Sequence, residues 1–186
     1  MNLIILQTLQ TLWFYVPAML ANMAPIAVQD LNLLPSLLRP LDGGKSWRGK
    51  RIFGDHKTVR GMLAGLVVGG LAGYGQYVLS AIPAISFISI APHSDLISAV
   101  VIGLLSGIGA LGGDAIKSFF KRRLKIAAGK SWALFDQIDF IIGATLTAGW
   151  FAQLTATHIL IALLLIGLGS YITSVIGVRL HIKESL

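Results

Sequence analysis

Long apolar segments separated by strongly basic connections constrain the fold of this chain more than any other feature. Five segments are mostly apolar: residues 3–27, 60–82, 96–116, 133–153 and 156–178. A helix needs about 20 apolar residues to cross the hydrocarbon core of a bilayer. Charged residues make up only 12% of the 186 residues, about half the fraction of a typical soluble domain. We therefore expect an all-α integral membrane protein with about five transmembrane helices, forming a single membrane-embedded domain over residues 1–186.

All 15 lysines and arginines lie on one side of this arrangement. They occupy the connection 28–59 with Arg60 at its edge, the connection 117–132 and the C-terminal tail, whereas 83–95 and 152–157 contain none. Because cytoplasmic connections are enriched in lysine and arginine, this side is predicted to be cytoplasmic. The N-terminus is then outside, the C-terminus is cytoplasmic, and the two basic loops are cytoplasmic. No basic region precedes the first apolar segment, so we expect a retained span rather than a cleaved signal peptide.

Glycines recur every four residues in two of the predicted spans. Gly65, Gly69 and Gly73 do so in the second span, and the pairs Gly103 with Gly107 and Gly109 with Gly113 do so in the third. This spacing places small residues on one helix face and lets two helix backbones approach closely. We therefore expect these glycines to mark helix–helix contacts rather than chemistry.

Three aspartates accompany the second basic connection. On a helix that continues from the third span, one face carries Asp114, Lys117, Ser118, Lys121, Arg122 and Lys125. Asp136 and Asp139 are three residues apart and point together at the start of the next span. A carboxylate at the centre of a membrane helix costs up to about 2.5–3.5 kcal/mol, and acidic residues contribute little to orientation. Because Mg²⁺ is typically held by carboxylates together with phosphate oxygens, these aspartates are predicted to bind Mg²⁺ beside a polyphosphate. Ordinary surface ion pairs are the alternative.

The first basic connection offers a second group of phosphate-binding candidates. Gly54 precedes Lys57, Thr58 and Arg60, and Thr58 is predicted to cap the following helix. A helix N-terminus flanked by cations is a suitable phosphate site. Upstream, Arg48, Lys50 and Arg51 could instead contact anionic lipid headgroups. Asp42 has no evident partner and is interpreted as a polar loop residue.

Two ordered motifs resemble those of membrane CTP-dependent cytidylyltransferases, and the closer resemblance is to the archaeal CDP-archaeol synthases. The motifs are FGDHKTVRG at 53–61 and GDAIKSFFKR at 113–122, followed by DQID at 136–139. The bacterial and eukaryotic pattern fits less well, because its Lys-Asp pair and its His-Gly-Gly element are absent and Gln137 replaces an arginine.

The resemblance implies transfer of a cytidylyl group from CTP to the phosphate of an unsaturated archaeal ether lipid, 2,3-bis-O-geranylgeranylglycerol 1-phosphate. Pyrophosphate would be released and Mg²⁺ required. The implied catalytic residues are Asp114, Lys117, Lys121, Asp136 and Asp139, and the implied metal ligands are the three aspartates. The implied nucleotide- and phosphate-binding residues are Gly54, Lys57, Thr58, Arg60, Lys117, Ser118, Lys121 and Arg122. Partners would be CTP, the isoprenoid glycerol phosphate and membrane lipids, without nucleic acid, while a homo-oligomer stays open.

Other functions stay open on the sequence. A phosphatidate cytidylyltransferase would use an acyl lipid, and a CTP-dependent polyprenol kinase would release CDP rather than pyrophosphate. A small anion channel or transporter with a basic mouth would explain the cations but not the carboxylates.

Overall fold

The computed structural model describes residues 2–92, 95–126, 132 and 135–179. The long helices are α1 (Leu3–Asp30), α2 (Val59–Ser80) and α4 (Leu96–Arg123); α5 (Phe135–Thr147) is shorter. The last helical stretch joins α6 (Ala156–Ile161), a π-helical segment (Ala162–Ile166) and α7 (Gly167–Arg179). Short elements fill the connections: a 3₁₀ turn (Pro35–Leu37), the hairpin of β1 (Ser46–Trp47) and β2 (Lys50–Arg51), α3 (Pro83–Ser86) and a second 3₁₀ turn (Gly149–Phe151).

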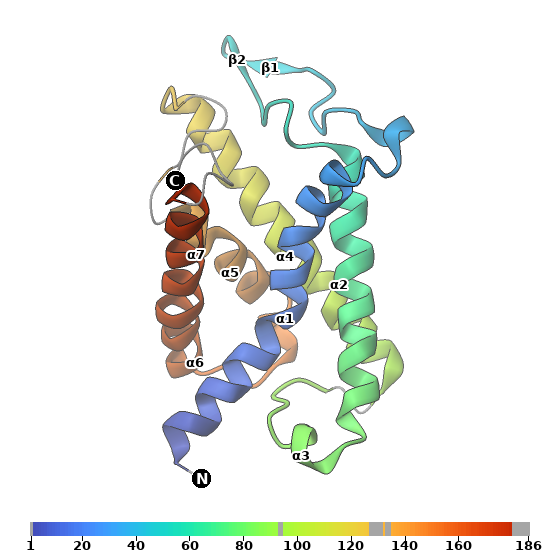
Figure 1. The fold of residues 1–186 in the computed structure, drawn as a ribbon, viewed down its shortest axis with the longest axis vertical. Helices are drawn as coiled ribbons and strands as arrows, with labels where there is room; N and C mark the ends of the chain where they lie inside the picture. Colours follow the sequence, from blue (N-terminus) through green and yellow to red (C-terminus); the bar gives the residue numbers. More distant parts are fainter. Residues whose placement is uncertain (1, 93–94, 127–131, 133–134, 180–186) are drawn as a thin grey trace.

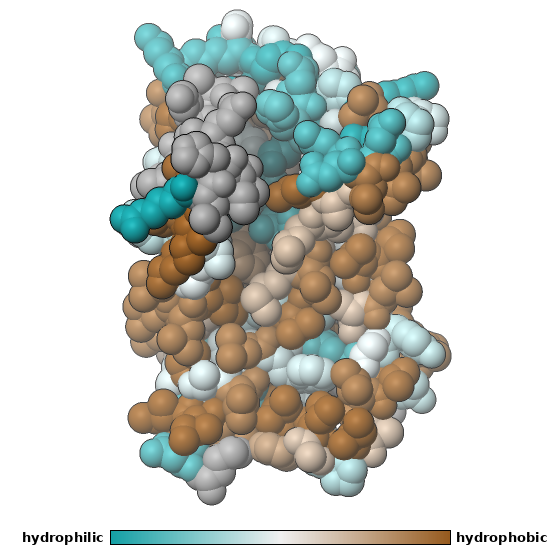
Figure 2. Space-filling model, viewed as in Figure 1, coloured by the Kyte–Doolittle hydropathy of each residue, from teal (hydrophilic) through white to brown (hydrophobic). Residues whose placement is uncertain are grey.

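The helices alternate in direction between two ends of the molecule (Figure 1). The N-terminus lies at one end, whereas the hairpin, the start of α2 and the end of α4 lie at the other. Figure 2 shows a brown apolar band around the middle of the molecule and teal hydrophilic residues over the end that carries the hairpin. The described parts of the two predicted basic connections thus lie at the same end.

Among the described residues, four helical stretches are long and apolar enough to cross a membrane: Leu3–Asp30, Val59–Ser80, Leu96–Arg123 and Ala156–Ile176. They match four of the predicted segments, and the third continues well past residue 116, as the shared face of its polar residues required. The mostly helical membrane architecture is therefore confirmed.

The segment predicted at 133–153 differs from a full span. Its helix, α5, has 13 residues and is about 20 Å long, whereas the hydrocarbon core is about 30 Å thick. Ile141 and Ala144 of α5 are fully buried against neighbouring helices, and a 3₁₀ turn follows at Gly149. At membrane depth, surrounding protein can provide hydrogen-bond partners for the backbone groups at the end of an interrupted helix. A helix such as α5 therefore does not need the full crossing length. A count of five crossings stays a prediction.

Glycines allow α4 to contact helices on two sides. A Cβ atom built on Gly69 of α2 would lie 2.6 Å from the carbonyl oxygen of Gly103 in α4, which is closer than real Cβ contacts. On the other side, a Cβ on Gly143 of α5 would collide with the carbonyl of Gly109, and one on Gly113 would collide with that of Asp139. The predicted glycine faces are thus confirmed as packing surfaces, and they bring the polar faces of α4 and α5 together.

Candidate active site

The side chain of Lys117 lies among the three predicted aspartates. Its Nζ is 3.1 Å from Oδ1 of Asp114, 3.0 Å from Oδ1 of Asp136 and 2.8 Å from Oδ2 of Asp139. Lys57, from the first basic connection, forms a close ion pair with the other oxygen of Asp114. Lys121 lies 3.4 Å from both oxygens of Asp136. The structure therefore brings together residues from both motifs.

The two aspartates of α5 differ in their surroundings. Asp136 accepts a hydrogen bond of 2.6 Å from the backbone N–H of Trp132 in addition to its lysine contacts. Asp139 is buried, and among the described residues no donor forms a hydrogen bond of good geometry with either of its oxygens, although Lys117 is at ion-pair distance. A buried carboxylate without such a donor is costly, so Asp139 is the carboxylate with the most to gain from an additional ligand.

Whether these carboxylates suit a metal ion depends on the lysines. Over the described residues, no group of three or more His, Cys, Asp or Glu side chains forms a ready-made metal site. Lys117 Nζ lies between the three carboxylates. The donor chemistry nevertheless fits a divalent cation, since the three carboxylates face one point, and Oδ1 of Asp139 has no hydrogen-bond donor among the described residues. A cation and the Lys117 ammonium group would compete for the same oxygens.

A polar cavity of about 260 Å³ opens beside this cluster. One wall is the loop that carries Phe53, Gly54, His56 and Lys57; the other is the α4 face with Asp114, Lys117, Ser118, Lys121 and Arg122. Six of the eight predicted phosphate-binding residues therefore share one cavity. Phe53 and His56 also line this cavity, and their position inside the first motif is the one feature of the sequence that indicates it.

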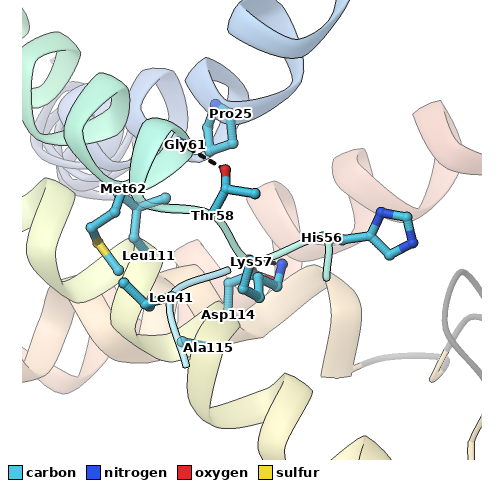
Figure 3. A pocket seen from close by; sticks show the side chains of 10 residues that line it. All are labelled: Pro25, Leu41, His56, Lys57, Thr58, Gly61, Met62, Leu111, Asp114 and Ala115. Carbon is cyan, nitrogen blue, oxygen red and sulfur yellow. Dashed lines mark hydrogen bonds and ion pairs between the residues drawn. The ribbon is translucent and has the colours of Figure 1, made fainter. Parts of the chain in front are cut away.

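Thr58 and Arg60 have other roles. Thr58 caps α2, where its hydroxyl accepts a hydrogen bond of 3.1 Å from the N–H of Gly61, as predicted (Figure 3). It lines a smaller cavity of about 40 Å³, which shares His56, Lys57 and Asp114 with the polar cavity. Arg60 is buried and donates a hydrogen bond of 3.0 Å from Nη1 to the carbonyl of Leu33, because the first turn of α2 directs it toward the preceding loop. The structure does not bring Arg60 to the polar cavity.

Asp42 organises the loop wall of the polar cavity, contrary to its interpretation as an unpartnered residue. Its carboxylate accepts hydrogen bonds from Arg51 Nη2 and from the backbone N–H groups of Gly44, Phe53 and Gly54, at 2.9–3.2 Å. Burial raises the pKa of this carboxyl, but the hydrogen bonds from Arg51 and from the backbone hold the pKa well below its ordinary value. The signal in the sequence was Asp followed by Gly-Gly, a typical turn pattern.

An apolar cavity of about 440 Å³ lies between α4 and α5. Its apolar lining includes Ile108, Ile116, Phe120, Phe135, Ile138, Ile142 and Leu146, and the small residue Gly112 lies among them. Lys117 and Asp139 also line it. Trp132 is a further lining residue, and its ring stacks on that of Phe135 with centroids 4.3 Å apart. No sequence pattern predicts this cavity, since it depends on how α4 packs against α5.

Lys117 thus lies at the boundary of two unlike spaces. It lines both the polar and the apolar cavity, and it contacts all three aspartates. A polar, cation-lined space next to an apolar one suits two reactants of opposite character. One would be a highly charged molecule and the other an amphipathic molecule with an anionic end.

Comparisons with known proteins agree with this arrangement. A family model described as CarS-like, CDP-archaeol synthase, matches residues 1–186. The CDP-archaeol synthase of Thermococcus gammatolerans is 41% identical over 134 residues, covering 72% of this chain and 69% of the relative. That of Pyrococcus furiosus is 34% identical over 178 residues, covering 95% and 96%. A solved structure of an intramembrane enzyme for archaeal membrane lipid biosynthesis is similar with a TM-score of 0.64 and 33% identity, covering 86% of this chain and 91% of that one.

Proposed function

Because the chain belongs to the CDP-archaeol synthase family, a family of CTP-dependent cytidylyltransferases in the membrane, we propose a specific reaction for it. The proposed donor is CTP, and the proposed acceptor is 2,3-bis-O-geranylgeranylglycerol 1-phosphate. The products are a CDP-lipid and pyrophosphate, and the proposed metal is Mg²⁺. We place the reaction at the cytoplasmic face of a single domain, since all 15 cations lie on one side of the predicted spans.

The observation that carries this proposal is the position of Lys117 between the two cavities. In the proposed complex the triphosphate of CTP occupies the polar cavity, where Lys57, Lys121 and Arg122 supply positive charge and Gly54 and Ser118 supply polar groups. The hydrocarbon of the acceptor occupies the apolar cavity, and its phosphate lies next to Lys117. The two phosphates then meet at the aspartate cluster.

The chemistry follows from this placement. An oxygen of the lipid phosphate attacks the α-phosphorus of CTP, a new P–O bond forms, and the bond to the β-phosphate oxygen breaks. Pyrophosphate leaves with the bonding electrons. The attacking oxygen is already anionic near neutral pH, so the step needs no strong base. The main barrier is the approach of two polyanions, and positioning with charge neutralisation lowers it.

In the proposed complex, lysine side chains contact both reactants. Lys57 and Lys117 pair with aspartates in the present structure. When phosphates enter the polar cavity, we propose that these ammonium groups turn toward phosphate oxygens and release carboxylate oxygens. Asp114, Asp136 and Asp139 would then hold Mg²⁺, which when bound neutralises charge on the triphosphate and polarises the phosphoryl group.

The decisive experiment offers purified protein CTP, Mg²⁺ and a panel of acceptors. We expect pyrophosphate and a CDP-lipid with the geranylgeranyl acceptor, and no turnover with EDTA. Preference for a diacyl phosphatidate would favour the phosphatidate branch, and release of CDP with a polyprenol would identify a kinase. Anion flux into liposomes without any CTP turnover would refute an enzyme.

A further inference from the structure

The β1–β2 hairpin contacts the last turns of α4 through a small aromatic and cationic cluster. The ring of Trp47 stacks on that of Phe119, with centroids 5.6 Å apart and planes at 24°. The guanidinium carbon of Arg123 lies 3.7 Å from the centroid of the Phe119 ring and 5.1 Å from that of Trp47. Contacts between a guanidinium group and aromatic rings are attractive. The hairpin is thus attached to α4 at its exposed end.

Hydrogen bonds run in both directions across the same contact. Nη1 of Arg123 donates to the backbone carbonyls of Arg51 at 2.9 Å and of Ile52 at 3.3 Å. Nζ of Lys50 donates to the backbone carbonyl of Arg123 at 2.9 Å. Both side chains therefore have partners inside the protein. This corrects the expectation that Lys50 contacts lipid headgroups, because its ammonium group is directed to α4.

The attached segment leads directly into the wall of the polar cavity. Arg123 holds the carbonyls of residues 51 and 52, and Asp42 holds the N–H groups of the next two residues, Phe53 and Gly54. Phe53 and Gly54 line the cavity opposite the α4 face. A hairpin with two-residue strands has little stability of its own, so its position depends on what it contacts.

We infer that Trp47, Lys50, Phe119 and Arg123 form a clamp that fixes the distance between the two walls of the nucleotide cavity. Arg123 is in this view a positioning residue, which acts through the loop and does not touch phosphate. The inference rests on the proposed function of the cavity. When the clamp is lost, the loop leaves its place for part of the time and the apparent affinity for CTP falls in proportion. The chemical step, once CTP is bound, is unaffected.

Steady-state kinetics test the clamp through the contrast between KM and kcat. For Arg123→Ala we expect a rise of about tenfold in KM for CTP with kcat nearly unchanged, the result of a closed loop populated about one tenth of the time. Arg123→Lys keeps the charge but lacks the planar group that stacks and donates to two carbonyls, so it should restore KM only in part. Lys125→Gln is the matched control: it removes an exposed cation two residues away and should behave like the parent.

A distance measurement tests the clamp without turnover. The chain has no cysteine, so Lys45→Cys and Leu124→Cys can carry the only two spin labels, one next to the hairpin and one at the end of α4. Ligand-free parent protein should give a narrow distance distribution, and Arg123→Ala a broad one. Trp47→Ala, which removes a half-exposed ring from the loop, should broaden it too and serves if Arg123→Ala fails to fold.

The outcomes separate this inference from the proposed function. Unchanged KM and narrow distributions in both alanine variants would overturn the clamp. A loss of kcat at unchanged KM would overturn it as well, because Arg123 would then take part in the chemistry. If the parent protein does not consume CTP, the proposed function fails, while the distance measurement still decides whether the hairpin is fixed by Arg123.

Discussion

The substitution Asp139→Asn separates two roles for the buried carboxylate of α5, a cation ligand or merely a partner of Lys117. Removing the only partner of a buried charge costs about 3–5 kcal/mol. Lys117, however, also lies 3.1 Å from Asp114 and 3.0 Å from Asp136, so it keeps two carboxylates after the substitution. The change also removes a buried charge that receives no hydrogen bond of good geometry from the described residues. We therefore expect the free energy of unfolding without divalent ions to change by no more than about 1 kcal/mol.

Thermal melting with and without Mg²⁺ provides the assay. For a chain of this size, about 1 kcal/mol corresponds to a Tm change of about 2–4 °C, and 3–5 kcal/mol to about 6–20 °C. Mg²⁺ at a hundred times its Kd should stabilise the parent by about 2.7 kcal/mol, or about 5–11 °C. Asp139→Asn should lose most of this shift and slow cytidylyl transfer at least about 100-fold. Asp55→Asn, in an exposed residue that pairs with Arg51 outside the cluster, is the control.

The opposite pattern would refute the metal assignment. A Tm drop of about 6–20 °C in EDTA, together with an unchanged shift on addition of Mg²⁺, would show that Asp139 serves only Lys117. Turnover at the parent rate would also remove Asp139 from the catalytic residues.

Four further substitutions test other parts of the structure. Gly69→Leu should remove the peak of folded protein in size-exclusion chromatography, because the new Cβ would lie 2.6 Å from a backbone oxygen. Gly75→Leu, whose Cβ would meet no described atom within 4 Å, should keep that peak. Lys121→Ala should raise KM for CTP about tenfold in steady-state kinetics through loss of a phosphate contact, and an unchanged KM would place it outside the nucleotide site. Gly112→Leu has room for its Cβ and should partly fill the apolar cavity, raising KM for the lipid but not for CTP; equal effects on both would contradict the separation of the two cavities. Asp42→Asn should lower Tm by a constant amount above about pH 4, where the carboxyl of the unfolded chain is ionised. The difference in Tm should shrink only at lower pH, because the pKa of this carboxyl is depressed in the folded state. A Tm difference that already shrinks between pH 7 and 5 would contradict this.

Helical periodicity explains why the polar face of α4 could be predicted. Asp114, Lys117, Ser118 and Lys121 share a face because of spacing along one helix, which is local information. The glycine contacts followed from the same kind of spacing. The position of Lys117 between three carboxylates could not be predicted from spacing, because it depends on how closely α5 approaches α4 at Gly143.

Loop residues were harder to predict for a different reason. Three of the four donors to Asp42 are backbone N–H groups, and their directions depend on the left-handed conformations of Gly43, Gly44 and Gly54. The direction of Arg60 depends on a carbonyl 27 residues earlier in the chain. Neither distance along the sequence nor residue type specifies such contacts. The short length of α5 was missed because apolar composition continues beyond the residue at which the helix ends.

The backbone of α4 has a consequence for the timing of turnover. It contacts the backbone of α2 at Gly103 and that of α5 at Gly109 and Gly113, so a shift or rotation of α4 would produce collisions on both sides. Collective helix motions in proteins take microseconds to milliseconds, whereas exposed side chains change rotamer in picoseconds to nanoseconds. The exchange of lysines from aspartates to phosphates requires only side-chain rotation. In the proposed reaction, this exchange therefore needs no movement of a helix.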